Sequence, residues 1–279
     1  AERAGAKVLR TDRNGGPATA RNVGVHAAAG DVVAFLDADD LWEPGHAEAC
    51  VALLDAHPEA VLAFSLVSKF GGAEDDPAPL LPDAEPVDAT SVLWEANPLA
   101  QSAAVVRRSA LLAVGGYRDG MRLSEDYELW FRLAWKHPFI CTHRRLVRYR
   151  VHAEQHSLQL DALYRSAWGI RHQQWKGIET QVDPTRRREV VAALHRGYER
   201  ELRAAWHQRA SAPLNAVLAQ HDKVPEGSAL YRRWWVRGRL LRPFWRIAAS
   251  AYDRLPRRIR ALRQRQPTSG SRRPGADQA

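Results

Sequence analysis

The first half of the chain alternates short apolar runs with longer alanine-rich or amphipathic segments, which indicates strands and helices in turn. One helix is expected over 17–29, where Pro17 opens the segment and Gly30 closes it. Another is expected to begin at Pro44, and strands are expected at the apolar runs 8–11, 32–36 and 61–70. This β-α-β-α-β order predicts an α/β fold with a mainly parallel sheet flanked by helices.

The alternation continues beyond the third strand. In order, we expect a loop over 71–88, a strand over 102–107, a short helix over 109–114, and an extended segment over 139–151. Ser124 stands where an N-cap is expected for a helix over 125–136. Acidic residues fill the first turn of that helix and basic ones follow its end, as the helix dipole favours.

Charge divides the chain into two halves. Residues 1–160 carry a net charge of −6 and residues 161–279 a net charge of +15. From about residue 158 the pattern changes to helices with Arg and Trp throughout. We therefore expect an α/β domain over 1–157, a helical Arg- and Trp-rich extension over 158–265, and a disordered polar tail over 266–279.

The composition narrows the class of protein further. The chain has 279 residues, 45% of them apolar, which is enough for a sizeable core. No run reaches the 18 or so apolar residues of a membrane span, and no signal peptide is recognisable. Cys50 and Cys141 are too few for a disulfide framework. We expect two buried thiols and a cytoplasmic location.

Three carboxylates crowd the sequence FLDADDLW, directly after the apolar run 32–36. Like charges this close raise one another's pKa unless a cation lies among them. Ligands of parallel α/β sheets bind beyond the carboxyl ends of the strands, and Mg²⁺ or Mn²⁺ prefers carboxylates together with substrate phosphates. The alternative is that Asp40 or Glu43 caps the helix opened by Pro44 while the other acids are solvated. The spacing alone leaves both readings open.

Three further motifs stand in register with this turn. They read RNGGPATARNVGVHAAAG from Arg13, VGGYRDGMRLSEDYELWFRLA from Val114 and VRYRVH from Val147. Each of the four is weak alone, but in this order they resemble a family 2 glycosyltransferase of the GT-A fold, the nucleotide-diphospho-sugar transferase fold. The resemblance runs from about residue 7 to 157, and implies that the α/β domain is a GT-A-like catalytic domain.

The resemblance implies a donor and metal site at the carboxylate turn. Asp37 would reach the ribose of the nucleotide, and Asp39 would bind a divalent metal, Mn²⁺ or Mg²⁺, with Asp40 as a helper. His152 would close the metal and diphosphate site. His156 is the less favoured substitute, and the alternative for either histidine is a surface or core position.

The resemblance also implies a nucleotide pocket and an acceptor side. Asn14, Arg21 and Asn22 would line the nucleotide pocket, although a plain turn before a helix also accounts for Asn14. An arginine early in a helix opposes the dipole unless an anion is near, so Arg21 is the most informative of the three. Glu125 and Asp126 would form the acidic pair at the acceptor side, with Asp126 as general base. The alternative is that both acids only satisfy a helix N-terminus.

The implied activity is metal-dependent transfer of a sugar from a nucleotide-diphospho-sugar to a hydroxyl of a glycan or lipid-linked acceptor, with inversion. Members of the family usually begin with an apolar strand, a Pro-x-Tyr-Asn-like turn and an acid that binds the base, and nothing similar precedes Val8. We therefore expect an N-terminally truncated domain that lacks roughly 45–50 residues. The alternative function is a non-catalytic remnant that acts through its basic region alone.

The stretch 231–265 holds 12 Arg and one Asp, with Trp and Leu recurring at mostly helical spacing. One interpretation is a peripheral element on an anionic membrane surface, at the inner face of the membrane. A second is a helical hairpin that packs its Trp residues on the catalytic domain. Nucleic-acid binding by Arg with interleaved aromatic residues ranks behind both.

Overall fold

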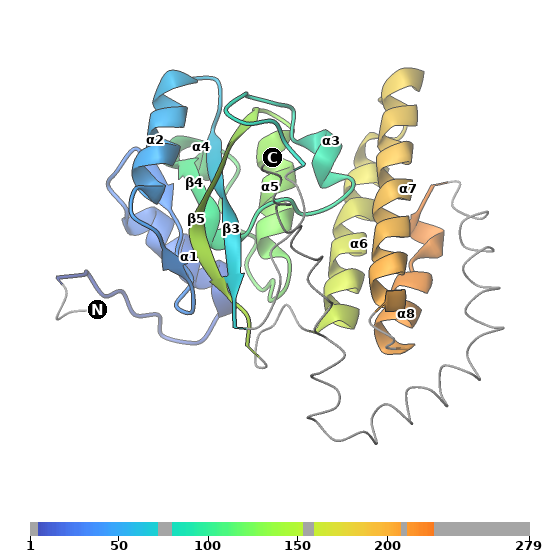
Figure 1. The fold of residues 1–279 in the computed structure, drawn as a ribbon, viewed down its shortest axis with the longest axis horizontal. Coiled ribbons are helices and arrows are strands. Elements are labelled where there is room, and N and C mark those ends of the chain that lie inside the picture. The colour runs from blue at the N-terminus through green and yellow to red at the C-terminus, as the bar shows by residue number, and fades with distance from the viewer. Residues whose placement is uncertain (1–4, 72–79, 153–158, 208–210, 226–279) are drawn as a thin grey trace, which may run out of the picture.

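The structure is a computed structural model that describes residues 5–71, 80–152, 159–207 and 211–225. A five-stranded sheet lies at the centre of the α/β part, with strand order β1-β4-β3-β5-β2 (Figure 1). Its strands are β1 (Val32–Ala34), β2 (Leu41–Trp42), β3 (Leu62–Phe70), β4 (Ala104–Arg107) and β5 (Phe139–Arg150). The predicted α/β class is confirmed.

The four helices predicted in the α/β part are present, and one further short helix, over 90–93, was not predicted. Those of the α/β part are α1 (Gly16–Ala27), α2 (His46–Ala56), α3 (Thr90–Leu93), α4 (Arg108–Ala113) and α5 (Glu125–Ala134). A 3-10 turn, Gln101–Ala103, precedes β4. Beyond them come α6 (Leu160–Ile178), α7 (Pro184–His207) and α8 (Ser211–Leu218). The expected change to helices after residue 158 is confirmed for these three.

The sheet is mixed, so the prediction of a mainly parallel sheet was wrong. β3 and β5 pair in parallel, whereas β1 with β4, β3 with β4, and β2 with β5 pair antiparallel. The β-α-β rhythm does place β1, β3 and β5 in the same direction. However, β4 lies between β1 and β3 and runs against both, and an apolar strand pattern does not reveal which strands become neighbours.

Alternation along the strands separates the two faces of the sheet. Ala63, Val105 and Ile140 come from three neighbouring strands and pack with Cys50 and Leu54 of α2. The residues on either side of them in each strand join a larger cluster on the other face, with side chains of α1, α4 and α5. Because successive side chains of a strand point to opposite faces, both faces are covered by apolar contacts.

The segment 8–11 forms no strand in the described structure, so that prediction was wrong. Val8 and Leu9 are 40% and 42% exposed. An apolar run becomes a strand only where another strand and a covering layer receive it, and this run meets neither among the described residues.

Ser124 takes the predicted N-cap position of α5, but its hydroxyl makes no cap hydrogen bond. Its backbone is in the left-handed region, with φ of 59°. Within the described residues its buried hydroxyl has no hydrogen-bond partner. The first turn of α5 instead carries three acids, and one of them, Asp126, accepts a hydrogen bond from the backbone N–H of Tyr127.

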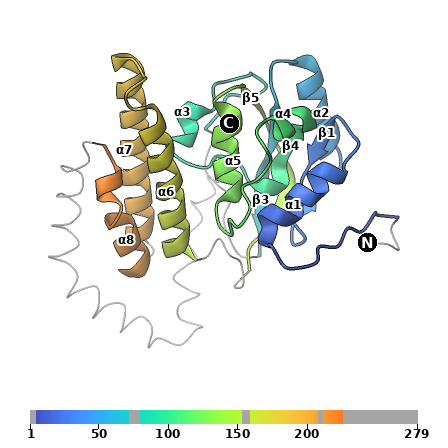
Figure 2. The same cartoon turned by 180° about the vertical axis from the view of Figure 1, so that it is seen from behind.

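The last three helices stand side by side beyond α5, on the side of the molecule away from α2 (Figures 1 and 2). A buried arginine joins them to the α/β part. Arg171 of α6 is 2% exposed, and it donates to the Tyr127 hydroxyl at 2.7 Å, to Oε1 of Glu201 at 2.8 Å and to the carbonyl of Glu95 at 3.1 Å. The described helices are thus packed on the α/β part through a buried polar contact.

Several predictions fall outside the described residues. These are the boundary near residue 157, His156, the Arg-rich stretch 231–265 and the tail 266–279. The division into parts therefore stays a prediction. Among the described helices, none has the length and apolar character that a bilayer crossing requires.

Candidate active site

The carboxylate turn follows β1 and closes on itself, since the backbone N–H of Asp40 donates to the carbonyl of Asp37 at 3.1 Å. It lies beside the 3-10 turn that precedes β4, because Phe35 already pairs with Ala104 through its backbone N–H. The turn therefore lies beyond the C-terminal end of β1, next to the start of the neighbouring antiparallel strand β4.

Ser102 holds this turn from the neighbouring segment. Its fully buried hydroxyl donates to Oδ2 of Asp40 at 2.5 Å and accepts from the backbone N–H of Asp37 at 3.0 Å. Its carbonyl accepts from the indole of Trp42 at 2.7 Å. The sequence reasoning did not identify Ser102 as a site residue, and no local motif could have done so, because only the strand order brings it to the turn.

Asp40 is the buried acid of the three, with 5% exposure. Its second oxygen accepts from the backbone N–H of Arg150 at 2.9 Å. Burial raises the pKa of Asp40, with smaller contributions from Asp39 and Asp37, against the lowering effect of its two hydrogen bonds. Both carboxylate oxygens of Asp40 are therefore engaged by the protein itself.

Asp39 faces His152, and the resemblance assigns both residues to a metal site. Its Oδ2 lies 3.0 Å from Nε2 of His152, and both side chains are more than a third exposed. The carbonyl of Asp39 also accepts from Nε of Arg150 at 2.8 Å, which fixes the turn against the end of β5. A carboxylate oxygen is a preferred donor for Mn²⁺, and a histidine nitrogen is the commonest metal ligand in proteins.

This donor set is small. Across the described ranges, no group of three or more His, Cys, Asp or Glu side chains gathers in a way that could hold a metal ion. Asp39 and His152 would therefore supply two ligands, and the remaining positions would go to oxygens of the substrate and to water. One or two carboxylates together with substrate phosphates are an ordinary arrangement for Mg²⁺, so Asp39, with His152 beside it, fits the group.

Arg21 joins the carboxylate turn to the acidic helix. Its two terminal nitrogens reach Oδ1 of Asp37 at 2.7 Å and Oε1 of Glu125 at 2.5 Å. The Arg21 side chain is 16% exposed, and its guanidinium carbon lies 5.7 Å from the centre of the Tyr117 ring. The anion expected near Arg21 is thus provided by two carboxylates of the protein.

Three crowded acids therefore have three different environments. Asp37 pairs with Arg21, Asp39 faces His152, and Asp40 is buried on Ser102. The repulsion expected among them is reduced by these separate partners. The helix-cap alternative for Asp40 does not apply, since its oxygens are used by Ser102 and Arg150, and α2 shows no side-chain cap.

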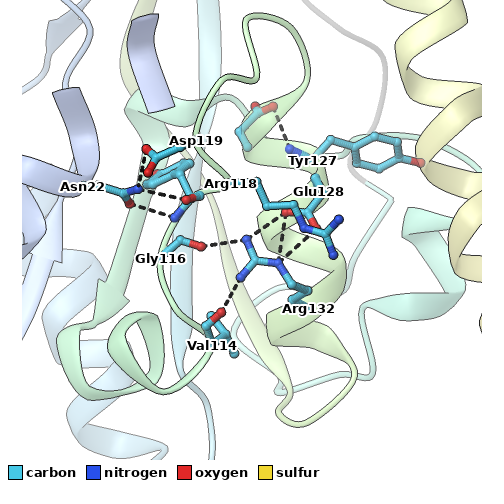
Figure 3. Close-up of polar contacts among 10 residues, drawn as sticks. Asn22, Val114, Gly116, Arg118, Asp119, Tyr127, Glu128 and Arg132 are labelled. Atoms are coloured by element: carbon cyan, nitrogen blue, oxygen red, sulfur yellow. Dashed lines mark hydrogen bonds and ion pairs between the residues drawn. The ribbon is translucent and has the colours of Figure 1, made fainter. Parts of the chain in front are cut away.

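Asn22 is engaged by the loop after α4 (Figure 3). Its amide donates to the carbonyl of Tyr117 and accepts from the N–H of the same residue, both at 2.8 Å. On the other side of this loop, Arg132 of α5 donates to the carbonyls of Val114 and Gly116, both at 2.6 Å, and pairs with Glu128 at 2.7 Å (Figure 3). The loop is thereby fixed between α1 and α5.

Asn14 is exposed, and its Oδ1 accepts from the backbone N–H of Gly16 at 3.0 Å. This hydrogen bond forms the turn that opens α1. The plain-turn account of Asn14 is therefore sufficient for its observed contact, and the structure places no other predicted site residue against it among its described hydrogen bonds.

Asp126 lies in the first turn of α5, half-buried, beside Glu125. Its Oδ1 accepts from the backbone N–H of Tyr127 at 2.7 Å and its Oδ2 from the Asn97 amide at 3.2 Å. Burial and then the neighbouring charge of Glu125 raise the pKa of Asp126 to about 6, although Tyr127, Arg21 and Asn97 oppose this. A carboxylate with such a pKa can exchange a proton near neutral pH.

The sequence also places the chain among known proteins. Residues 1–154, more than half of the chain, match the family described as glycosyl transferase family 2. The chain belongs to this family.

Two relatives illustrate the match. The amylovoran biosynthesis glycosyltransferase AmsE of Erwinia amylovora is 28% identical over 126 residues, which cover 45% of this chain and 47% of that protein. The O-antigen biosynthesis protein RfbC of Myxococcus xanthus is 36% identical over 130 residues, 46% of this chain and 10% of that protein. The chain thus matches less than half of the length of either relative.

Among solved structures, the fold is similar to S. aureus TarS 1-349 in complex with UDP-GlcNAc. The TM-score is 0.59 at 15% sequence identity, and the match covers 79% of this chain and 65% of that chain. This likeness confirms the GT-A-like fold that the four motifs imply.

Proposed function

We propose that this chain transfers a sugar from a nucleotide-diphospho-sugar to a hydroxyl group of an acceptor, with the help of a divalent cation. The observation that carries the proposal is the pair of contacts made by Arg21, which joins the carboxylate turn through Asp37 to the acidic helix through Glu125. The proposed donor side and the proposed acceptor side would thereby be parts of one connected site.

Asp39 and His152 would hold the cation, which when bound supplies neutralising charge for the departing diphosphate. Asp40, Ser102 and Arg150 keep the turn in place so that Asp39 points to His152. Asp37 would bind the nucleotide, Arg21 would take part by orienting Asp37 through their ion pair, and Asn22 would act indirectly, by fixing the loop at Tyr117.

Asp126 is the proposed general base. It would accept the proton of the acceptor hydroxyl as that oxygen forms a bond to the anomeric carbon and the bond from this carbon to the diphosphate oxygen breaks. A single displacement of this kind inverts the anomeric centre. A pKa near 6 suits the role, because the carboxylate is then mostly ionised at neutral pH and still able to take up a proton.

The relatives suggest which substrates to try first. TarS was solved with UDP-GlcNAc, and AmsE and RfbC are named for the biosynthesis of amylovoran and O-antigen. We propose a nucleotide-sugar donor and a glycan or lipid-linked acceptor for this chain.

Calorimetric titration with UDP and with GDP, each with and without Mn²⁺, tests the donor site. We expect one nucleotide to bind at least about tenfold more tightly with Mn²⁺, equal to about 1.4 kcal/mol, and Asp39→Ala to remove this gain. Asp31→Ala is the matched control, since Asp31 is an exposed acid just before β1. Binding that is indifferent to Mn²⁺, or equal gains in wild type and Asp39→Ala, would contradict the proposed site.

A further inference from the structure

Asn97 lies on the segment that connects α3 to the 3-10 turn before β4, opposite the first turn of α5. We propose that Asn97 is a positioning residue that orients the carboxylate of Asp126 and keeps it ionised. This inference rests on the proposed function in one respect, the role of Asp126 as base. The family resemblance assigned no role to this segment.

The geometry gives each oxygen of Asp126 its own donor. The Asn97 amide donates to Oδ2 at 3.2 Å, and the backbone N–H of Tyr127 donates to Oδ1 at 2.7 Å. Two donors on different oxygens restrict rotation of the carboxylate plane. A carboxylate can accept about four hydrogen bonds, so lone pairs are left for an incoming hydroxyl.

The backbone before Asn97 is tightly held, although Asn97 itself is exposed. The carbonyl of Glu95 accepts from Arg200 at 2.7 Å and from Arg171 at 3.1 Å, and its carboxylate pairs with Arg196 at 2.9 Å. On the other side of the residue, Pro98 restricts Asn97 to extended conformations. The Asn97 amide therefore lies on a segment that contacts with α6 and α7 hold in place beside Asp126.

The charges around Asp126 explain why a neutral donor matters there. Glu125 on the same helix disfavours the ionised form of Asp126, and Arg21 from α1 favours it. Tyr117, from the loop before α5, also lies near this carboxylate, and the charge of Asp126 contributes to the raised pKa of the Tyr117 phenol. Asn97 adds a donor from a fourth direction, and a hydrogen bond to a carboxylate lowers its pKa.

The test is a direct titration of Asp126 by NMR in the full chain, with aspartate labelled with ¹³C at the side-chain carboxyl. Asp126→Asn identifies the resonance by its disappearance. In Asn97→Ala the midpoint of Asp126 is expected to rise by about 0.5–1 pH unit, the size of one lost hydrogen bond. In Asn97→Asp it is expected to rise further, because a second carboxylate then faces the first.

Ser91→Ala is the matched control, since Ser91 is exposed on nearby α3 and loses one hydrogen bond, to the carbonyl of Asp88. In Ser91→Ala the titration midpoint of Asp126 is expected to equal that in the wild type. Unchanged midpoints in both Asn97 variants would overturn the inference. The NMR titration needs no substrate, so its result is independent of the nucleotide calorimetry. Failure of the calorimetry would contradict the proposed function, whereas the NMR result alone decides whether Asn97 acts on Asp126.

Discussion

The hydroxyl of Ser102 serves two residues of the carboxylate turn at once, as a donor to Asp40 and an acceptor from the backbone of Asp37. Residue types at the turn could be predicted from the sequence, because acids after an apolar strand indicate a ligand site at a strand end. Their individual environments could not, because Ser102 and Arg150 are far away along the chain. The Asp39–His152 contact was anticipated only through the family resemblance.

Asp126 has a cost in stability that can be measured. Its pKa is near 6 in the folded chain and near its ordinary value of 3.8 when unfolded. Above pH 6 the folded state therefore bears the cost of ionising this half-buried carboxylate, whereas below about pH 4 the group is neutral in both states and the cost disappears. Asp126→Asn, which is neutral at every pH, is expected to be more stable than the wild type at pH 7.5 by on the order of 1–2 kcal/mol.

Thermal unfolding of both proteins between pH 4 and pH 8 checks this expectation. The difference in Tm should be largest at pH 7–8, decrease as the pH falls through 6, and vanish near pH 4. A constant difference across the range would mean that the substitution acts through packing or through the helix dipole rather than through the ionisation of Asp126.

At the scale of elements, the loop between α4 and α5 shows how packing selects glycine. Gly116 has φ of +66°, and a Cβ there would lie 2.5 Å from Oδ1 of Asn22. Gly115 has a similar φ of +79°, but a Cβ would meet nothing within 4 Å. The sequence VGGY predicts a turn from either glycine, and only the structure distinguishes their requirements.

Gly115→Ala and Gly116→Ala form a matched pair. Gly115→Ala is expected to lower the free energy of unfolding by about 1 kcal/mol, from backbone strain alone. Gly116→Ala adds a clash with the amide that holds Tyr117, so a loss of about 2–3 kcal/mol is expected. Urea unfolding measures both. Equal losses would show that Asn22 moves aside freely and does not fix the loop.

The helices and the interior strands could be predicted because their apolar periodicity and their Pro and Gly boundaries are local. The order of the strands could not, since β4 inserts between β1 and β3 through contacts distant in sequence. The strand predicted over 8–11 is not formed for a related reason, because a local strand pattern forms no strand without a neighbouring strand to pair with. The cap expected from Ser124 could not be judged from its residue type either, since its backbone is left-handed and its side chain makes no cap hydrogen bond.

For the whole molecule, the described C-terminal helices contribute to the site through Arg171 and Glu95. Arg171 contacts Tyr127, which follows the proposed base directly, and α7 approaches so closely that a Cβ on Gly197 would lie 2.4 Å from the carbonyl of Glu95. The helical part therefore supports the segments on either side of the proposed base, Asp126. Composition alone separated the two halves of the chain by charge and gave no sign of this buried contact.

The charge asymmetry leads to a final prediction, for the full chain on membranes. Residues 161–279 carry a net charge of +15, and 231–265 hold 12 Arg against one Asp. Each Arg near an anionic bilayer contributes about 1 kcal/mol, and salt screens this attraction over about 10 Å at 0.1 M. The chain is expected to float with phosphatidylserine-containing vesicles at low salt, to be released by about 0.5 M NaCl, and to stay unbound with pure phosphatidylcholine. Absence of flotation at low salt would contradict the membrane interpretation, whereas flotation with both lipids would show that Trp and Leu, rather than charge, dominate the contact.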